Sequence, residues 1–261
     1  MWKCHRVQEL INVQNLKENL ILLHQIRHIN HLKMQGLPET RVTVLISGEG
    51  SNLQALIDAR SSTLDYMKIV RVISNKINAN GLNRAKAAGI PTTYHNLISG
   101  KYHRAGEPDK SVKALGREKY DADLASLVIA DNPDIVICAG FMHILTTKFL
   151  DPLNEREIPI INLHPALHGK YDGMNAIERA YEDFQDGKLE NNRTGVMIHH
   201  VVSEVDRGKP LVQRYIECNK SESLKQLTER MHRHENQIVV EGIALMAEEI
   251  WKKRFNLHTF Y

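Results

Sequence analysis

From residue 41 onward, the chain alternates between short apolar runs and longer segments whose apolar residues recur every three or four positions. The short runs are rich in β-branched residues, which is typical of buried strands. They cover residues 42–47, 69–74, 92–94, 135–139 and 158–163. Helical spacing predicts helices that begin near Leu53 and Gly81, while residues 99–111, rich in Gly, Pro and charge, predict an exposed loop. Because strands that alternate with helices are joined by right-handed crossovers, we expect an α/β fold: a Rossmann-like, mostly parallel, twisted sheet with helices on both faces.

The C-terminal part of the chain departs from this alternation. A helix is expected over residues 175–185, followed by strands at 195–202 and 211–217. These two strands flank Asp206, and the turn between them predicts an antiparallel edge of the sheet. A capping-box sequence at 223–226 then opens a long final helix.

The two ends of the chain differ from the segment between them. We expect residues 1–40 to be an N-terminal extension, helical or poorly ordered, residues 41–255 to form a single domain, and residues 256–261 to be a tail. Leucines in the first segment follow helical spacing up to a Gly-Leu-Pro break at 36–38. Its basic residues suggest an organelle-targeting peptide, but it contains no serine, which favours a loosely attached extension or an incorrectly assigned start.

Composition limits the classes of function. The 261 residues, 42% of them hydrophobic, are enough for one sizeable core. A net charge of +3 without a dense Lys/Arg block argues against a nucleic-acid partner but allows a phosphorylated small molecule. Cys4, Cys138 and Cys218 are too widely spaced for a zinc ribbon or a disulfide framework, so we expect a reducing, cytoplasmic compartment. No apolar run is long enough to span a membrane. The oligomeric state, monomer or homodimer, stays open.

The run at 158–163 leads to two polar residues, Asn162 and His164, two positions apart. Side chains at this spacing share one face of a strand, and the carboxyl ends of parallel strands are where open α/β sheets build sites. An amide can stabilise an oxyanion and an imidazole can move a proton, while a carboxylate such as Asp206 can tune that imidazole. These are the parts of an acyl-transfer site without a covalent nucleophile. Taken alone, His164 is more typical of a strand-end histidine that only satisfies a backbone group than of a catalytic residue.

Two turns after predicted strands suit ligands. Gly48-Glu49-Gly50-Ser51-Asn52 joins a strand to a helix, so its free N–H groups suit a phosphate, although a plain capped turn explains the sequence as well. It is neither a Walker loop nor a full dinucleotide fingerprint. The second turn, Ala139 to Leu145, predicts either a core turn that buries Phe141 and Leu145 or an apolar slot for a flat heterocycle.

The motifs become specific in combination. The sequence carries, in this order, ISGxGSNLQALID at 46–58, ISNK at 73–76, AGFMxIL at 139–145, INLHP at 161–165, GKYxG at 169–173 and VDRG at 205–208. Together they resemble the phosphoribosylglycinamide formyltransferase family of purine biosynthesis, from about residue 41 to about residue 247. The resemblance implies direct transfer of a formyl group from 10-formyltetrahydrofolate, as co-substrate, to the amine of glycinamide ribonucleotide. It implies small-molecule substrates, no metal ion and no membrane.

The resemblance also implies roles for individual residues. The catalytic residues would be Asn162, His164 and Asp206, with Asp206 raising the pKa of the histidine. The ribonucleotide would be bound by Gly50, Ser51, Asn52 and Glu235. The folate would be bound by Arg117, Met142, His143, Ile144, Leu145 and Asn162. With the first and fourth strands adjacent, both turns would flank one crevice at the topological switch point.

Two departures from the family pattern bear on these roles. Glu49 stands beside the expected phosphate turn, and we expect it to point to solvent. His143 replaces a common Arg. Formyltetrahydrofolate deformylase, methionyl-tRNA formyltransferase, a nucleotide-dependent oxidoreductase and a non-catalytic binding protein are the alternatives. The first two fit the chain's length or its phosphate turn less well, the third lacks its glycine fingerprint, and a binding protein has no need of the catalytic trio.

Overall fold

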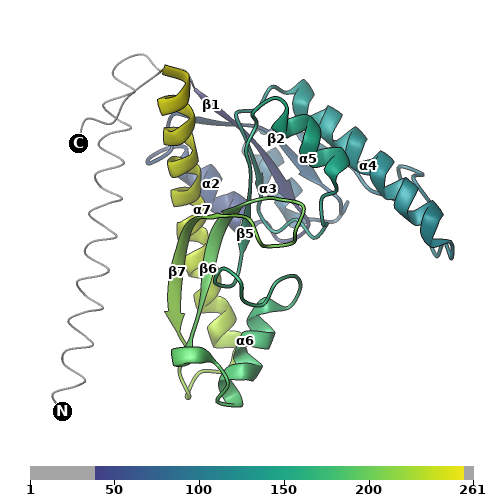
Figure 1. The fold of residues 1–261 in the computed structure, drawn as a ribbon. Coiled ribbons are helices and arrows are strands. Elements are labelled where there is room, and N and C mark those ends of the chain that lie inside the picture. Colours follow the sequence, from purple (N-terminus) through teal and green to yellow (C-terminus); the bar gives the residue numbers. More distant parts are fainter. Residues whose placement is uncertain (1–38, 256–261) are drawn as a thin grey trace, which may run out of the picture.

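The computed structural model describes residues 39–255. The expected N-terminal extension, apart from its last two residues, and the tail at 256–261 lie outside this range. Within it, the chain forms seven strands and six α-helices (Figure 1). The strands are β1 (Thr40–Ile46), β2 (Met67–Ser74), β3 (Thr92–Tyr94), β4 (Ile135–Cys138), β5 (Ile160–His164), β6 (Arg193–His200) and β7 (Pro210–Glu217). The helices are α2 (Ser51–Ala59), α3 (Asn80–Ala87), α4 (Lys110–Ala130), α5 (Thr147–Asn154), α6 (Ala176–Gln185) and α7 (Leu224–Phe255), with a 3₁₀ turn η1 (Glu190–Asn192) before β6.

The strands form one sheet in the order β3-β2-β1-β4-β5-β6-β7. The first five strands in the sequence pair in parallel, whereas β6 pairs antiparallel with β5 and β7 antiparallel with β6. This confirms the predicted α/β fold with a mostly parallel sheet and an antiparallel edge. It also confirms that the first and fourth strands are neighbours, which puts the switch point of the sheet between β1 and β4.

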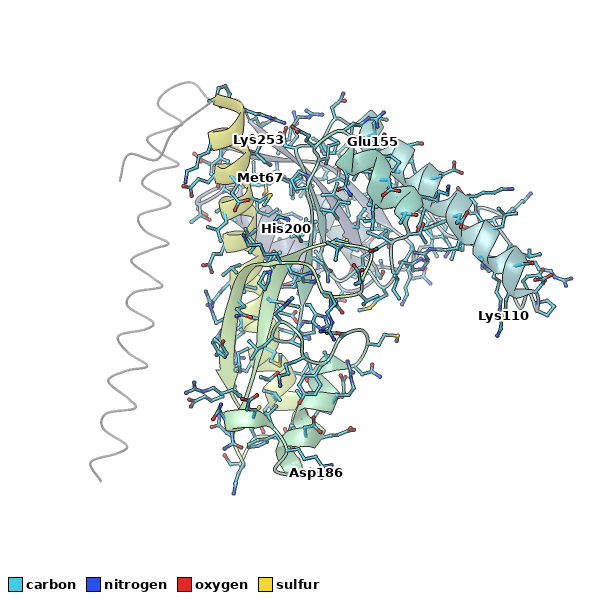
Figure 2. All side chains as sticks on the ribbon, viewed as in Figure 1. Met67, Lys110, Glu155, Asp186, His200 and Lys253 are labelled. Atoms are coloured by element: carbon cyan, nitrogen blue, oxygen red, sulfur yellow. The ribbon has the colours of Figure 1, made fainter. Side chains whose placement is uncertain are left out.

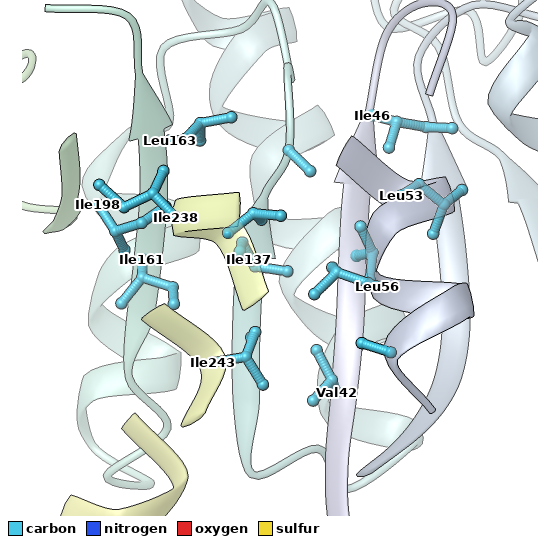
Figure 3. Packing of buried hydrophobic residues seen from close by; sticks show 14 of the residues in the cluster. Val42, Ile46, Leu53, Leu56, Ile137, Ile161, Leu163, Ile198, Ile238 and Ile243 are labelled. Carbon is cyan, nitrogen blue, oxygen red and sulfur yellow. The ribbon is translucent and has the colours of Figure 1, made fainter. Parts of the chain in front are cut away.

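Apolar side chains cover both faces of the sheet. On one face, α2, α3, α6 and α7 pack against the sheet, and Figure 3 shows Ile238 of α7 beside Ile198 of β6. On the other face, α4 and α5 pack over the central strands through residues such as Tyr120 and Phe149. Helices on both faces bury the central strands completely, which explains why those strands read as continuous apolar runs.

Two helices on the second face were not predicted from the sequence. The expected loop at 99–111 ends at Asp109, where the carboxylate accepts a hydrogen bond of 2.8 Å from the Ser111 amide and caps α4. The N-terminal end of α4 near Lys110 projects away from the sheet (Figure 2). Helix α5 is short and contains Pro152. Among all the helices between residues 39 and 255, none is both long and apolar enough to cross a membrane.

Candidate active site

Asn162, His164 and Asp206 meet at the carboxyl end of β5. Asn162 and His164 lie on one face of the strand, as predicted, and the strand extends one residue further than expected, to His164 itself. Asp206 reaches them from the turn between β6 and β7. Its Oδ1 atom accepts a hydrogen bond of 3.3 Å from Asn162 Nδ2, and its Oδ2 atom lies 3.5 Å from His164 Nδ1. The structure therefore brings together the three side chains of the predicted trio.

The backbone around Asp206 is tightly constrained. Asp206 has a φ of 57°, in the left-handed region that L residues rarely adopt. A Cβ atom at Gly208 would lie 1.7 Å from the His200 carbonyl oxygen, so this turn accepts only glycine there. The Gly173 amide donates a hydrogen bond of 2.8 Å to Asp206 Oδ2. Burial alone would raise the pKa of Asp206, but its contacts with His199, the Gly173 amide and His164 hold it below its ordinary value. The carboxylate is therefore ionised at neutral pH.

His164 is buried, and its environment opposes its charge. Burial lowers the pKa of His164, Asp206 raises it, and the net pKa lies below its ordinary value. Asp206 thus acts in the direction expected from the sequence, but desolvation outweighs it. His164 Nε2 lies 3.2 Å from the Tyr171 carbonyl oxygen, and this contact is a hydrogen bond only when Nε2 carries a hydrogen. The neutral imidazole is the predominant form at neutral pH, which suits a general base.

A second histidine that sequence reasoning did not identify joins this cluster. His199 on β6 stands directly opposite Asn162 in the antiparallel register. Its Nε2 atom lies 3.1 Å from Asn162 Nδ2 and 3.4 Å from Asp206 Oδ1. The two carboxylate oxygens of Asp206 therefore face one imidazole each. The signal in the sequence was a histidine within the strand predicted at 195–202, but neither the partner of that strand nor its register can be read from that pattern alone.

The predicted phosphate turn lies at the start of α2. Gly50 has a φ of 77°, and a Cβ atom there would lie 2.6 Å from the Gly81 Cα atom. Within residues 39–255, no side-chain hydrogen bond caps this end of α2. An uncapped helix start leaves backbone N–H groups, with the positive end of the helix dipole, available to an anion. This geometry suits a phosphate at Gly50, Ser51 and Asn52.

Glu235 lies beside the same turn. It is buried on α7, and its Oε2 atom accepts a hydrogen bond of 3.3 Å from Asn52 Nδ2. Burial raises the pKa of Glu235 above its ordinary value. The Oδ1 atom of Asn52 is buried and accepts no hydrogen bond from any residue between 39 and 255. A buried carboxylate and an unpaired carbonyl oxygen form a pair of acceptors suited to a ligand with N–H donors.

Glu49, the unusual residue within the turn, is exposed and faces α3. Its carboxylate accepts hydrogen bonds of 2.7 Å from Asn80 and 2.6 Å from Arg84, and these bonds lower its pKa. Arg84 also donates to the Glu49 carbonyl oxygen. The negative charge of Glu49 is thereby balanced by a cation from α3, in agreement with the expectation that the side chain lies at the solvent-exposed surface.

The second predicted turn follows β4 and is joined to the end of β1. The Met142 amide donates a hydrogen bond of 2.7 Å to Ser47 Oγ. Met142 and Ile144 are exposed, whereas Phe141 and Leu145 are buried in the second core. The prediction of a core turn is therefore confirmed for Phe141 and Leu145, and the apolar slot for a heterocycle stays a prediction. Two apolar side chains are free to contact a ligand, while Leu145, predicted to bind folate, packs in the core instead.

Arg117 on α4 is held against this turn. Its guanidinium donates to the Ile144 carbonyl oxygen and contacts His143 Nδ1, and its Nε atom lies 3.3 Å from the buried Asp121. Burial and then Arg117 lower the pKa of His143 to about 4, so this imidazole is neutral at neutral pH. Asp121 also accepts the Thr146 amide at 2.8 Å. A fixed guanidinium beside two exposed apolar side chains suits a flat ligand that carries a carboxylate.

Comparison with known proteins agrees with this geometry. Residues 40–243 match the formyl transferase family. The chain is 45% identical over 204 residues to a phosphoribosylglycinamide formyltransferase of Schizosaccharomyces pombe, covering 77% of this chain and 94% of that protein. It is 42% identical over 218 residues to the phosphoribosylglycinamide formyltransferase of Saccharomyces cerevisiae, covering 81% and 99%. The fold matches glycinamide ribonucleotide transformylase 1 from Symbiobacterium toebii with a TM-score of 0.67 and 28% identity, covering 81% of this chain and 89% of that one. The chain therefore belongs to the formyl transferase family.

Proposed function

We propose that this chain transfers the formyl group of 10-formyltetrahydrofolate to the amine of glycinamide ribonucleotide, in purine biosynthesis. Its similarity to two yeast phosphoribosylglycinamide formyltransferases, along nearly the whole of each, supports these substrates. The observation that carries the chemistry is the cluster around Asp206, whose carboxylate lies within 3.5 Å of His164 and receives a hydrogen bond from Asn162. Among residues 39–255, no serine, cysteine or lysine side chain contacts Asp206, Asn162 or His164 in this cluster, which favours direct transfer over a covalent acyl-enzyme.

The reaction exchanges one carbon–nitrogen bond for another. The amine nitrogen attacks the formyl carbon, and the tetrahedral intermediate carries a negative oxygen. Collapse of the intermediate breaks the bond to folate N10, while one proton leaves the amine and one reaches N10. Asp206 favours the His164 tautomer with hydrogen on Nδ1, because that nitrogen faces the carboxylate. Nε2 is then the base that takes the amine proton and returns it to N10, and the Asp206 carboxylate stabilises the imidazolium in between.

The substrate amine has to reach His164 Nε2. This atom lies 3.2 Å from the Tyr171 carbonyl oxygen in the loop between β5 and α6, and in the tautomer with hydrogen on Nδ1 it has no hydrogen to donate to that oxygen. We expect the amine to displace this carbonyl when the ribonucleotide binds. Asn162, on the same face of β5, would lie beside the formyl oxygen.

The remaining site residues divide between the two substrates. Gly50, Ser51 and Asn52 would hold the phosphate at the start of α2, where no side chain caps the helix. Glu235 would accept hydrogen bonds from the glycinamide end. The Glu235–Asn52 hydrogen bond ties these two groups together, which supports their binding parts of one molecule.

On the folate side, Met142 and Ile144 would contact the flat ring system with His143 between them. Arg117 would meet the carboxylate tail of the folate, because its guanidinium is held at the edge of the same turn. Leu145 would support the turn from within the core. The transfer as written needs no metal ion, and we place it in the cytoplasm, with small molecules as the only partners that the chemistry requires.

One assay tests the proposal. Purified protein, supplied with glycinamide ribonucleotide and 10-formyltetrahydrofolate, should form formylglycinamide ribonucleotide, detected by mass spectrometry. His164→Ala should lose about 10²- to 10⁴-fold in kcat, the usual contribution of a general base, with an unchanged far-UV circular dichroism spectrum. His103→Ala, a histidine in the loop before α4, serves as the matched control and should retain the wild-type rate.

Two outcomes would contradict the assignment. Product formation by His164→Ala at the wild-type rate would refute the mechanism. Release of formate from 10-formyltetrahydrofolate without the ribonucleotide, and no formylated ribonucleotide, would instead identify a hydrolase of the deformylase type.

A further inference from the structure

His199 is buried beside the proposed catalytic residues and directs both ring nitrogens at defined partners. Its side chain is 2% exposed, and it lies on β6 directly opposite Asn162. Nδ1 lies 2.8 Å from the His200 carbonyl oxygen. Nε2 lies 3.1 Å from Asn162 Nδ2 and 3.4 Å from Asp206 Oδ1. These contacts determine where the hydrogen atoms of the ring must be.

A carbonyl oxygen only accepts hydrogen bonds, so Nδ1 of His199 carries a hydrogen. Neutral imidazole has a single N–H group, and Nε2 is then an acceptor. The Asn162 amide nitrogen donates one hydrogen to His199 Nε2 and the other to Asp206 Oδ1. Both amide hydrogens of Asn162 are thereby directed toward His199 and Asp206, which is the direction called inward below. The end of Asn162 that remains for the substrate is its carbonyl oxygen, Oδ1.

This orientation conflicts with stabilisation of an oxyanion, which requires a hydrogen-bond donor. Turning the Asn162 amide over would present its NH₂ group to the formyl oxygen. With neutral His199, the turned amide would place its carbonyl oxygen against two acceptors, His199 Nε2 and Asp206 Oδ1. With protonated His199, the same turn would let the new Nε2–H group donate to that carbonyl oxygen and to Asp206. The turn exchanges an oxygen for a nitrogen of similar size, so it needs no repacking.

The groups around His199 act on its charge in opposite directions. Asp206, from the turn after β6, stabilises the cation. His164 on β5 faces it with ring centroids 6.5 Å apart, and His200 follows it on β6, so either of these opposes its charge when protonated. Cys138 on β4 pairs with Asn162, and burial raises the pKa of this thiol to about 12, so it adds no charge. The anion in contact with His199, at 3.4 Å, is Asp206.

We propose that His199 is a positioning residue whose protonation decides which end of the Asn162 amide faces the substrate. Neutral His199 holds the NH₂ group inward. Protonated His199 holds the carbonyl oxygen inward and frees the NH₂ group for the formyl oxygen. The inference rests on the proposed function for its catalytic consequence, but the orientation of the amide is a property of the protein without substrate.

Two variants separate this role from a structural one. In His199→Gln, the side-chain amide should turn its NH₂ group toward Asp206, because a carboxylate only accepts, and it would donate to Asn162 Oδ1 at every pH. We expect kcat within about 10-fold of wild type and one ionisation fewer in its pH profile. His199→Phe fills the space without a polar atom. It should lose about 10²-fold in kcat, the cost of removing one oxyanion donor, with little change in KM.

A His199→Gln enzyme with the full wild-type pH profile, or a His199→Phe enzyme with wild-type kcat, would overturn the proposal.

Nuclear magnetic resonance of the ¹⁵N-labelled wild-type protein tests the amide directly, without substrate and without relying on the folding of any variant. The Asn162 NH₂ resonances should shift together with the ring nitrogens of His199 as pH is lowered. Asn162 resonances that stay unchanged while His199 titrates would refute the switch, whatever the enzyme's activity. Coupled shifts in a protein that forms no formylated ribonucleotide would instead leave the switch standing and refute the proposed function.

Discussion

Three glycines allow the cost of the phosphate turn to be measured. Gly50 combines a positive φ of 77° with close packing, since a Cβ atom would lie 2.6 Å from the Gly81 Cα atom and 3.2 Å from its nitrogen. Gly89, after α3, has a positive φ of 68° but open space around the Cβ position. Gly48 has neither feature. Alanine at Gly48 therefore carries neither cost, alanine at Gly89 carries only the cost of the positive φ, and alanine at Gly50 carries that cost and the cost of the close contact.

The expected losses follow from these geometries. Gly48→Ala should change the free energy of unfolding by less than about 0.5 kcal/mol, as for an unconstrained surface position. Gly89→Ala should cost about 1 to 2 kcal/mol, the penalty of a left-handed backbone with a Cβ atom. Gly50→Ala should cost that amount plus about 1 to 3 kcal/mol of overpacking, because both contacting atoms are backbone and no side chain can move aside. Its total loss is then about 2 to 5 kcal/mol.

Urea unfolding followed by far-UV circular dichroism measures these differences, provided that the m-value is the same in all four proteins. Gly50→Ala should also raise KM for the ribonucleotide, because relief of the contact with Gly81 displaces the turn proposed to hold the phosphate. A stability loss in Gly50→Ala no larger than that of Gly89→Ala would refute the reasoning, since it would mean that the approach of Gly81 does not constrain the turn.

Other predictions follow from the site. Burial raises the pKa of Glu235, so the folded state binds its proton more tightly than the unfolded state, and its contribution to stability is lost as pH rises through the folded pKa. Glu235→Gln should therefore raise the urea midpoint at pH 7 but not at pH 4, while raising KM for the ribonucleotide; an unchanged midpoint at pH 7 would contradict the burial argument. Arg117→Lys should raise KM for the folate about 10-fold and leave KM for the ribonucleotide unchanged, because an ammonium cannot reproduce the paired contacts of the guanidinium. Steady-state kinetics with each substrate varied in turn measures both constants. A raised KM for the ribonucleotide alone would show that Arg117 serves the other substrate. Dialysis against EDTA should leave kcat unchanged, and a loss restored by a divalent cation would refute direct transfer without a metal.

The sequence predicted the positions of strands best where the burial of a short segment alone determines its pattern of apolar residues. The predicted bounds of β4 and of its neighbours β1 and β5 agree with the structure to within about two residues. Central parallel strands are buried on both faces, so their sequences must be apolar throughout. Helix α4 was missed although Tyr120, Leu124 and Val128 are spaced four apart and buried on one face. Its exposed first turns and Gly116 obscure that pattern. The capping carboxylate of Asp109 was a further signal at its start.

The chemistry of the site was less predictable because it depends on competing energies. The attraction of His164 to Asp206 follows from residue types alone, but the desolvation that outweighs it depends on how deeply the strand end is buried. In the same way, Leu145 and Ile144 are neighbours of similar character, yet one packs in the core and the other is exposed. Only the path of the turn after β4 decides which of them is available to a ligand.

The antiparallel edge explains why His199 in particular escaped prediction. Had the strand beside β5 been parallel to it, its carboxyl end would have contributed a loop at the height of Asn162. Because β6 is antiparallel, it instead places a strand side chain directly opposite Asn162, and the chain offers two adjacent histidines for that position. A shift of one residue in register would replace His199 by His200 and turn the former to the opposite face. The turn that follows β6 carries Asp206, and within it Gly208 packs against the His200 carbonyl oxygen. The two adjacent histidines therefore divide between the two features of this edge: the side chain of His199 meets the Asn162 amide, and the backbone of His200 packs against the turn that carries the carboxylate.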